Sequence, residues 1–344
     1  MSPPAASLPP RSGDQSGTPS GVLADYWRPS AALAVLSRRA RMFAAIRALF
    51  ADRGVLEVET PVLSRHATTD PALASLRLAT ADPAPTSGLY LQTSPEFPMK
   101  RLLAAGCGPI YQICKVFRDD ERGRRHHPEF TLLEWYRPGF TLQALMLEVA
   151  DVARAALERP ELEVEFVRYR DLFRTALQVD PWEASPEALR AIAMAAVPGS
   201  EHLRLDRDGW LDLLMSQCLE PDLGRDRLTF VHDYPPSQAA LARLRQDEVP
   251  VAERFELYLQ GMELANGFHE LSDDAEQRRR FEQDLATRRE RGQPEVPMDV
   301  ELLAALAAGL PDSAGVALGL DRLLLLAIGG THIDQVLAFP VERA

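Results

Sequence analysis

The sequence predicts an α+β fold on a mainly antiparallel sheet flanked by helices. Two runs that alternate between apolar and polar residues, 110–118 and 130–137, enclose a polar segment and are typical of an antiparallel hairpin. Residues 142–219 show helical periodicity, and strand-like runs return in the last third of the chain. Strands on both sides of a helical middle, joined by hairpins, favour this fold class.

The first 54 residues divide into a tail and a helix. Residues 1–30 are half proline, serine or glycine, so we expect a mobile, disordered tail before a single domain at 31–344. Apolar residues at spacings of three and four then predict an amphipathic helix that stops at Gly54. Residues 55–60 alternate apolar residues, Leu56 among them, with glutamates and predict a half-buried strand.

The remaining elements follow from the same two periodicities. Helices are expected at residues 142–157, 169–177, 186–196, 208–219, 273–291 and 320–328, the third with Ser185 as its N-cap. Strands are expected at residues 228–232, 254–260, 262–266 and 315–319.

Composition and missing signals exclude several classes of protein. The formal net charge of −12 disfavours a protein whose main task is to grip a nucleic-acid backbone, although a local basic patch remains compatible with it. The longest strongly apolar run, residues 323–328, is far shorter than the ~20 residues of a membrane span, and no secretory signal is visible. Cys107, Cys114 and Cys218 form no CxxC pair, so we expect no zinc or disulfide framework and a reducing, cytoplasmic compartment.

Three segments carry more polar residues than plain strands need. In the first, Arg118 ends one strand, while Glu134 and Tyr136 share a face of the next strand with Phe130. A carboxylate and a phenol beside large apolar groups could hold an ammonium group. The alternative is a basic, solvated hairpin tip.

The second segment places Glu256, Glu263, Asn266 and Glu270 within 15 residues on short strands. Hard oxygen ligands at this density suit Mg²⁺, which commonly shares its coordination with substrate phosphates. The alternative is a surface ribbon with exposed acids.

The third segment, residues 315–322, alternates small and apolar residues and then opens an apolar helix with Arg322. Glycine lets a ligand approach the backbone, and a buried arginine needs a partner. The alternative is a helix cap with an internal ion pair to Asp321. Residues 315–322 lack GxGxxG, and GxxxxGK[ST] occurs nowhere, so neither a Rossmann nor a P-loop nucleotide site is indicated.

In this order the three segments resemble the three signature motifs of class II aminoacyl-tRNA synthetases, and more narrowly those of lysyl-tRNA synthetases. The matching stretches are Phe117-Arg118, RHHPEFT at 125–131, ELANG at 263–267 and GLDR at 319–322. The helix and strand before Pro61 are similar to motif 1, which forms the dimer interface in that family. The resemblance therefore implies a class II catalytic domain and a homodimer.

Lysyl-tRNA synthetases carry an anticodon-binding domain before the catalytic domain, and here we expect only the tail. The chain therefore resembles the truncated branch of the family, which activates (R)-β-lysine or lysine with ATP and Mg²⁺. That branch joins the amino acid, through an adenylate, to a lysine side chain of elongation factor P. On this interpretation tRNA and membranes are not expected as partners. Two alternatives stay open: a minimal lysyl-tRNA synthetase, and a non-catalytic regulatory paralogue that binds lysine and ATP.

The resemblance also implies roles for individual residues, with Arg118 and Arg322 as the catalytic pair. Residues implied to bind ATP are Arg118, Asp119, Asp120, His127, Phe130, Glu263, Leu264, Gly319 and Arg322. Residues implied to bind the amino acid are Ser94, Pro95, Glu96, Glu134, Tyr136, Asn266, Glu270 and Ala317. Glu256 and Glu263 are implied as ligands of Mg²⁺.

The chain departs from the family pattern at three places. Asp119-Asp120 replaces Asn-Glu, and the shorter Asp120 predicts a weaker or water-mediated contact near adenine. His127 replaces asparagine, which would add pH dependence if the imidazole titrates. Ala317 stands where lysyl-tRNA synthetases commonly carry glycine, and we expect its methyl group to tilt preference from α-lysine towards β-lysine.

Overall fold

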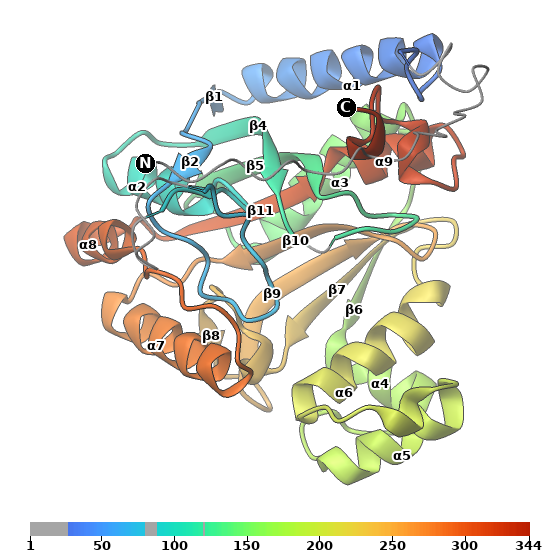
Figure 1. The fold of residues 1–344 in the computed structure, drawn as a ribbon, viewed down its shortest axis with the longest axis vertical. Coiled ribbons are helices and arrows are strands. Elements are labelled where there is room, and N and C mark those ends of the chain that lie inside the picture. Colours follow the sequence, from blue (N-terminus) through green and yellow to red (C-terminus); the bar gives the residue numbers. More distant parts are fainter. Residues whose placement is uncertain (1–26, 80–87, 120) are drawn as a thin grey trace, which may run out of the picture.

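A computed structural model describes residues 27–79, 88–119 and 121–344 of the chain. Its centre is a large, mainly antiparallel sheet with helices on both faces (Figure 1), so the predicted α+β class is confirmed. The strand order is β1–β4–β5–β11–β10–β9–β7–β6, with β8 paired to β9. Only the β1–β4 and β6–β7 pairs of this sheet are parallel in the described residues.

The strands are β1 (Leu56–Glu57), β4 (Ile110–Phe117), β5 (Glu129–Pro138), β6 (Val164–Arg168), β7 (Leu228–Tyr234), β8 (Leu244–Arg245), β9 (Val251–Tyr258), β10 (Glu263–His269) and β11 (Ser313–Gly319). A separate small ribbon joins β2 (Leu63–Ser64) to β3 (Tyr90–Leu91). The predicted hairpin is confirmed as β4 and β5, which pair antiparallel from Ile110 opposite Tyr136 to Phe117 opposite Glu129.

The α-helices are α1 (Leu33–Asp52), α2 (Glu96–Ala104), α3 (Leu142–Leu157), α4 (Tyr169–Leu177), α5 (Pro186–Ala196), α6 (Arg207–Leu214), α7 (Asp274–Glu290), α8 (Val300–Gly309) and α9 (Leu320–Ala327). Helices α3, α4 and α5 have the predicted bounds. Their starts are set locally, because Thr141 Oγ1 accepts from Ala144 N in α3 and Ser185 Oγ accepts from Ala188 N in α5. Gly54 follows α1 with a φ of +65°, a conformation that favours glycine.

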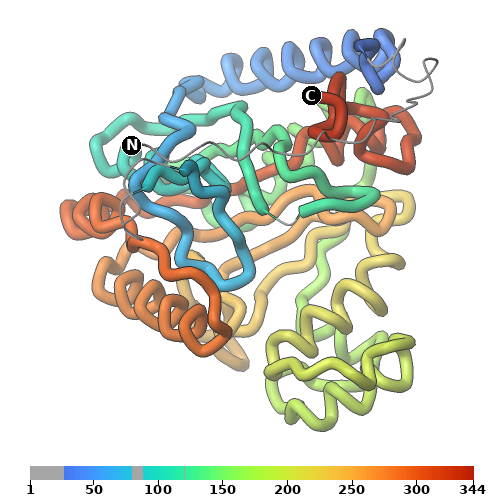
Figure 2. Tube along the Cα trace, in the orientation of Figure 1, coloured from blue at the N-terminus to red at the C-terminus, as the bar shows by residue number. Residues whose placement is uncertain are grey.

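Three apolar cores hold the layers together. The largest packs one face of the sheet, with Trp135 at its centre, against α1, α3 and α9. A second core joins α4, α5 and α6 to the β7–β9 end of the sheet, and a third packs α2 against α8. Helices α4–α6 form a group beside the main body, seen at the lower right of Figure 2. No helix in the described ranges is long and apolar enough to cross a membrane.

The alternation of side chains along β5 decides which residues point away from the largest core, to the opposite face of the sheet. Leu133 and Trp135 point into the largest core, so Glu134 and Tyr136 point to the opposite face. This face is only partly covered, by α7, α8 and the segment after β2 (Figure 1). Arg288 of α7 holds that segment by donating from Nη1 to Asp70 O at 2.9 Å.

Some predicted elements were wrong in extent or exposure. The strand at 55–60 has only two paired residues, and the side chain of Leu56 is 56% exposed because β1 lies at the edge of the sheet. The helix expected at 208–219 begins at Arg207 and changes at Met215 into a π-helix. Helices α2 and α8 and strand β6 were not predicted.

Most of the predicted tail, residues 1–26, lies outside the described residues. At its end the chain is anchored, because Ser30 N donates to Ala338 O at 2.8 Å and Ala31 N donates to Leu337 O at 3.0 Å. Figure 2 shows the C-terminal segment beside the start of α1. These bonds connect the two ends of the predicted 31–344 domain.

Asp321 ties three elements together at the start of α9. Its Oδ2 accepts from the backbone nitrogen of Thr131 in β5 at 2.7 Å, and its Oδ1 lies 2.5 Å from Arg39 Nη2 in α1. The carboxylate is buried, so both partners compensate for the cost of removing its charge from water.

We predict that Asp321→Ala lowers the free energy of unfolding by about 3–5 kcal/mol, because it leaves Arg39 and an amide nitrogen without their partner. Urea denaturation followed by circular dichroism measures this. Glu282→Ala, on the exposed face of α7, is the matched control and should change stability by less than about 0.5 kcal/mol. A loss below about 1 kcal/mol in Asp321→Ala would contradict the prediction.

Candidate active site

A cavity of about 1540 Å³ opens on the partly covered face of the sheet. Strand register explains which side chains line it. One row across the sheet joins Gln112, Glu134, Ala317, Asn266 and Glu256, each directly opposite the next on neighbouring strands. Directly opposed residues point to the same face, so five strands deliver side chains to one line, and Glu134, Ala317 and Asn266 in its middle line the cavity.

The adjacent row carries Tyr136, Gly315, Phe268 and Arg254 in the same manner. Gly315 is required there, because a Cβ atom would overlap the Tyr136 ring and the carboxylate of Glu270. Because Gly315 has no side chain, Tyr136 and Glu270 can lie directly against the backbone of the sheet.

Carboxylates dominate one half of the cavity. Glu134 Oε2 accepts from Ser94 Oγ and Oε1 accepts from Tyr136 Oη, both at 2.7 Å. Burial, helped by the charge of Glu96, raises the pKa of Glu134 to about 8. Burial also raises the pKa of Glu270 to about 7, against the attraction of a neighbouring ammonium group. These acids would gain their charge most readily beside a bound cation.

Guanidinium groups dominate the other half. Arg118, just beyond β4, lies over the Phe130 ring at 5.1 Å from its centroid and 3.3 Å from Glu121 Oε1. Arg322 in the first turn of α9 donates from Nη1 to Glu263 O at 2.9 Å. Its Nη2 lies 2.6 Å from His126 Nε2. The ion pair of Arg322 is thus made with Glu263 at 3.4 Å, whereas Asp321 pairs with Arg39.

The pKa of His126 reflects the positive charge in this half of the cavity. Burial lowers its pKa, and the charges of Arg322, Arg118 and Arg125 lower it further, outweighing Glu121. The imidazole is therefore neutral and accepts the hydrogen bond from Arg322. A polyanion would find several cationic groups together here.

A cluster of acids adjoins the guanidinium groups. Burial and then the charge of Glu256 raise the pKa of Glu263, and burial and then the charge of Glu263 raise the pKa of Glu220 to about 7. Mutual repulsion of this kind is relieved by a divalent cation, and Glu263 lines the cavity. The donor set at Glu263 therefore fits Mg²⁺.

Most predicted site residues meet at this cavity. Those that line it are Ser94, Glu96, Arg118, His127, Phe130, Glu134, Tyr136, Glu263, Leu264, Asn266, Glu270, Ala317, Gly319 and Arg322. Pro95 does not line the cavity; it precedes α2 as its N-cap residue. Asp119 does not line it either, and its backbone nitrogen donates to Ala74 O. Asp120 lies outside the described residues.

Glu256 faces the cavity side of the sheet without lining the cavity. Its Oε2 accepts from Tyr234 Oη at 2.7 Å and from Tyr258 Oη, and its Oε1 lies 2.5 Å from Arg254 Nη2. His127 is likewise engaged elsewhere: its Nε2 accepts from Val341 N at 2.9 Å. The predicted contacts of Glu256 with a metal and of His127 with phosphates stay predictions.

Among the cationic residues that sequence reasoning missed, two contact predicted site residues directly. Arg254 donates from Nε to Asn266 Oδ1 at 3.2 Å and pairs with Glu256, so it bridges two predicted site residues. Lys100 lies between Glu96 and Glu270. Their positions on β9 and α2 gave no motif; only the register and the packing of α2 bring them to the site.

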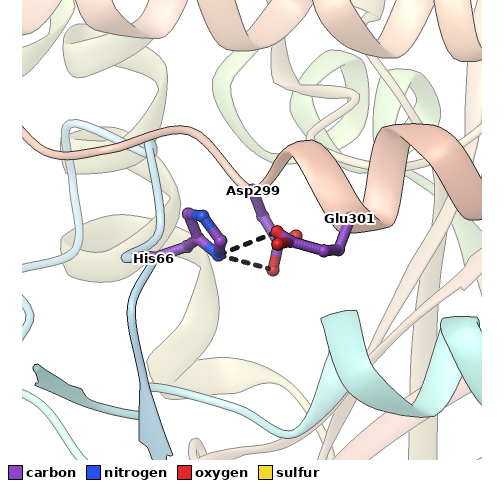
Figure 3. A group of neighbouring side chains, drawn as sticks. All are labelled: His66, Asp299 and Glu301. Carbon is purple, nitrogen blue, oxygen red and sulfur yellow. Dashed lines mark ion pairs between the residues drawn. The ribbon is translucent and has the colours of Figure 1, made fainter.

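The segment after β2 forms the outer wall. His66 Nδ1 lies 3.2 Å from Glu301 Oε2 and 3.9 Å from Asp299 Oδ2 at the start of α8 (Figure 3). Ala67 N also donates to Pro297 O. These contacts connect the wall to α8, on the side of the cavity away from Arg322.

The fold is that of a class II synthetase domain. Residues 23–343 match the family model of tRNA synthetases class II (D, K and N), and the chain belongs to that family. The family expected from the three motifs is therefore confirmed.

Its relatives include proteins that bear one name, elongation factor P–(R)-β-lysine ligase. The proteins of that name from Enterobacter sp. (strain 638) and Salmonella gallinarum are each 49% identical to the chain over 321 residues. Both alignments cover 92% of this chain and 98% of the relative. The protein of that name from Klebsiella pneumoniae subsp. pneumoniae is 48% identical over 324 residues.

We predict that Glu134→Gln flattens the pH dependence of stability. The pKa of Glu134 is raised from 4.5 to about 8 on folding, so the folded protein holds a proton that the unfolded chain loses within this window. Stability of the wild type therefore falls as pH rises between these values, by up to about 1.4 kcal/mol per pH unit from this group. Urea denaturation at pH values across the window measures the slope. An equally steep fall in Glu134→Gln and the wild type would refute the assignment.

Proposed function

We propose that the chain is an ATP-dependent ligase. It activates (R)-β-lysine or lysine as an adenylate and transfers the aminoacyl group to a lysine side chain of elongation factor P, forming an amide. The observation that carries this proposal is a single cavity with a guanidinium half and a carboxylate half. A diamino acid fits the second half and a triphosphate fits the first, so the two substrates would meet between them. The shared name of the relatives supports (R)-β-lysine and elongation factor P as the substrates that are joined.

In the first step, a substrate carboxylate attacks the α-phosphorus of ATP and pyrophosphate leaves. Both reactants are anionic, so the chain must neutralise their repulsion and the charge that develops in the transition state. Arg118 is the group best situated to bridge the carboxylate and the α-phosphate, with Arg322 beyond it for the terminal phosphates. The face of Phe130 offers a stacking surface for the base.

Magnesium completes this charge balance. Glu263 would hold it beside Arg322, and bound Mg²⁺ supplies further positive charge for the phosphates. Glu256 is the second proposed ligand. It would have to exchange a tyrosine or arginine partner for the ion, because both of its carboxylate oxygens are engaged.

In the second step, the ε-amine of the acceptor lysine attacks the carbonyl carbon of the adenylate, AMP leaves and an amide forms. No nucleophilic side chain of the ligase is required, because the adenylate is already activated. The chain contributes positioning, through Asn266 near the reacting carboxyl and Glu134 and Glu270 at the ammonium groups.

We also propose that the protein is a homodimer in the cytoplasm. Leu33 of α1 and Leu56 of β1 are exposed on the two elements that resemble motif 1. The three cysteines are free thiols, in keeping with a reducing compartment.

The experiment that tests this function offers labelled (R)-β-lysine or lysine, ATP and Mg²⁺ to the protein with either elongation factor P or tRNA as acceptor. Label in elongation factor P is the expected result. Label in tRNA alone would favour a minimal lysyl-tRNA synthetase. Absence of amino-acid-dependent pyrophosphate exchange would favour a non-catalytic paralogue.

We predict that Arg118→Ala lowers amino-acid-dependent pyrophosphate exchange by at least about 100-fold, because it removes a donor to the transition state. The matched control is Arg122→Ala, an exposed arginine of the same hairpin loop that does not line the cavity. Unchanged exchange in Arg118→Ala would contradict the assignment of this residue.

We predict that Ala317→Gly shifts the ratio of kcat/KM for β-lysine and α-lysine towards α-lysine. Ala317 lies between Glu134 and Asn266 in the row across the sheet, so its methyl group occupies space between the ammonium and carboxyl ends of the substrate. The ratio is measured from adenylation of the two amino acids by the wild type and by Ala317→Gly. An unchanged ratio would contradict the prediction.

A further inference from the structure

Lys100 is a buried lysine that contacts two of the acids lining the cavity, Glu96 and Glu270. Its side chain projects from α2, one helical turn after Glu96, and the residue is only 1% exposed. The ammonium nitrogen lies 2.7 Å from Glu96 Oε1 and 2.5 Å from Glu270 Oε2. Burying such a charge is costly and is tolerated only where carboxylates compensate for the lost water.

The choice of lysine at this position is specific. In the given sequence lysine occurs only at positions 100 and 115, and the other members of the 38 Lys and Arg residues are arginine. Lys115 is half-exposed and pairs with Glu129 at 3.2 Å. The ammonium group of Lys100 is a compact point charge with three donors that lies between two carboxylates, whereas the guanidinium that the chain uses elsewhere is larger and planar.

The charges around Lys100 can be counted. Glu96, Glu134 and Glu270 face one another closely enough for each to raise the pKa of Tyr136, the neutral member of the cluster. Cys114, on β4, faces Glu134, and its thiol is kept neutral because burial raises its pKa to about 12. Three carboxylates and one ammonium group leave two negative charges when all are ionised. Two is the number of ammonium groups on a diamino acid.

We propose that Lys100 is a positioning residue that sets the charge of the amino-acid pocket: its contacts with Glu96 and Glu270 offset one of the three negative charges, and the net charge of two that remains matches the two ammonium groups of the substrate. This inference rests on the proposed function, because the pocket is taken to bind a lysine-like acid. Lys100 would be a cation that belongs to the protein itself. Its positive charge favours the ionised forms of Glu270 and Glu96 although both carboxylates are removed from water.

The state of Lys100 suits this role. Its neighbours Glu270 and Glu96 raise its pKa well above the usual value, outweighing burial. The group therefore stays protonated, and it is buried behind Glu96 and Glu270 without lining the cavity itself. Without it, Glu96, Glu134 and Glu270 would repel one another with no compensation, and the pKa values of Glu134 and Glu270 would rise further.

The test is Lys100→Met, which keeps the apolar stem and removes the charge, with Lys115→Met as the matched control. Pyrophosphate exchange is measured with varied lysine and varied ATP between about pH 6 and pH 9. Lys100→Met should raise KM for lysine at least about tenfold at neutral pH and move the rise of kcat/KM for lysine by about one pH unit to the alkaline side. KM for ATP should stay within about twofold, and Lys115→Met should behave as wild type.

A second comparison separates charge from packing. Glu96→Gln alone leaves one net negative charge and should raise KM for lysine, whereas the double variant with Lys100→Met restores two and should bring KM back towards wild type. This comparison holds even if Lys100→Met alone fails to fold. A double variant worse than Glu96→Gln, or an unshifted pH profile in a folded Lys100→Met, would overturn the inference. Wild-type protein without lysine-dependent exchange would instead overturn the proposed function.

Discussion

The register of β5, β11 and β10 is the constraint on which the rest of the site depends. Side chains of a strand alternate between two faces, so a slip of one residue would send Glu134 into the apolar core and Trp135 into the cavity. The core prevents this, because Trp135 is packed between α1 and α3. The same apolar packing that stabilises the sheet therefore holds Glu134, Ala317 and Asn266 in one line across it.

Burial then gives each half of the cavity its chemistry. Charges removed from water interact strongly with their neighbours, and for this reason Glu134 and Glu270 have raised pKa values while His126, among guanidinium groups, has a lowered one. Groups of like charge in such places reduce the stability of the empty protein. Substrates and ions of opposite charge relieve that repulsion. The same groups that lower the stability of the protein therefore favour the binding of ligands with the opposite charge.

Much of the fold was predictable because its signals are local. The stripe of apolar residues in α1, the caps of α3 and α5, and the alternation of β4 and β5 each lie within one short segment. One of the misses has a cause that is not local: Leu56 alternates as a core residue would, but the order of the strands places β1 at the edge of the sheet and Leu56 is exposed. The short helix α2 was not recognised, although its two faces carry Met99 into a core and Lys100 into the site.

The sequence by itself determined the family, the three motifs and most of the residues that line the cavity, because these are properties of short stretches read in order. Only the tertiary structure decided that Lys100 and Arg254 belong to the same site, that Glu256 is engaged with tyrosines, and that His127 bonds to the C-terminal segment. The reason is physical: Lys100 meets Glu270, and His127 meets Val341, through packing across more than a hundred residues of chain, which no periodicity within one segment encodes. Arg254 and Glu256 reach nearer partners, and strand register decides which ones.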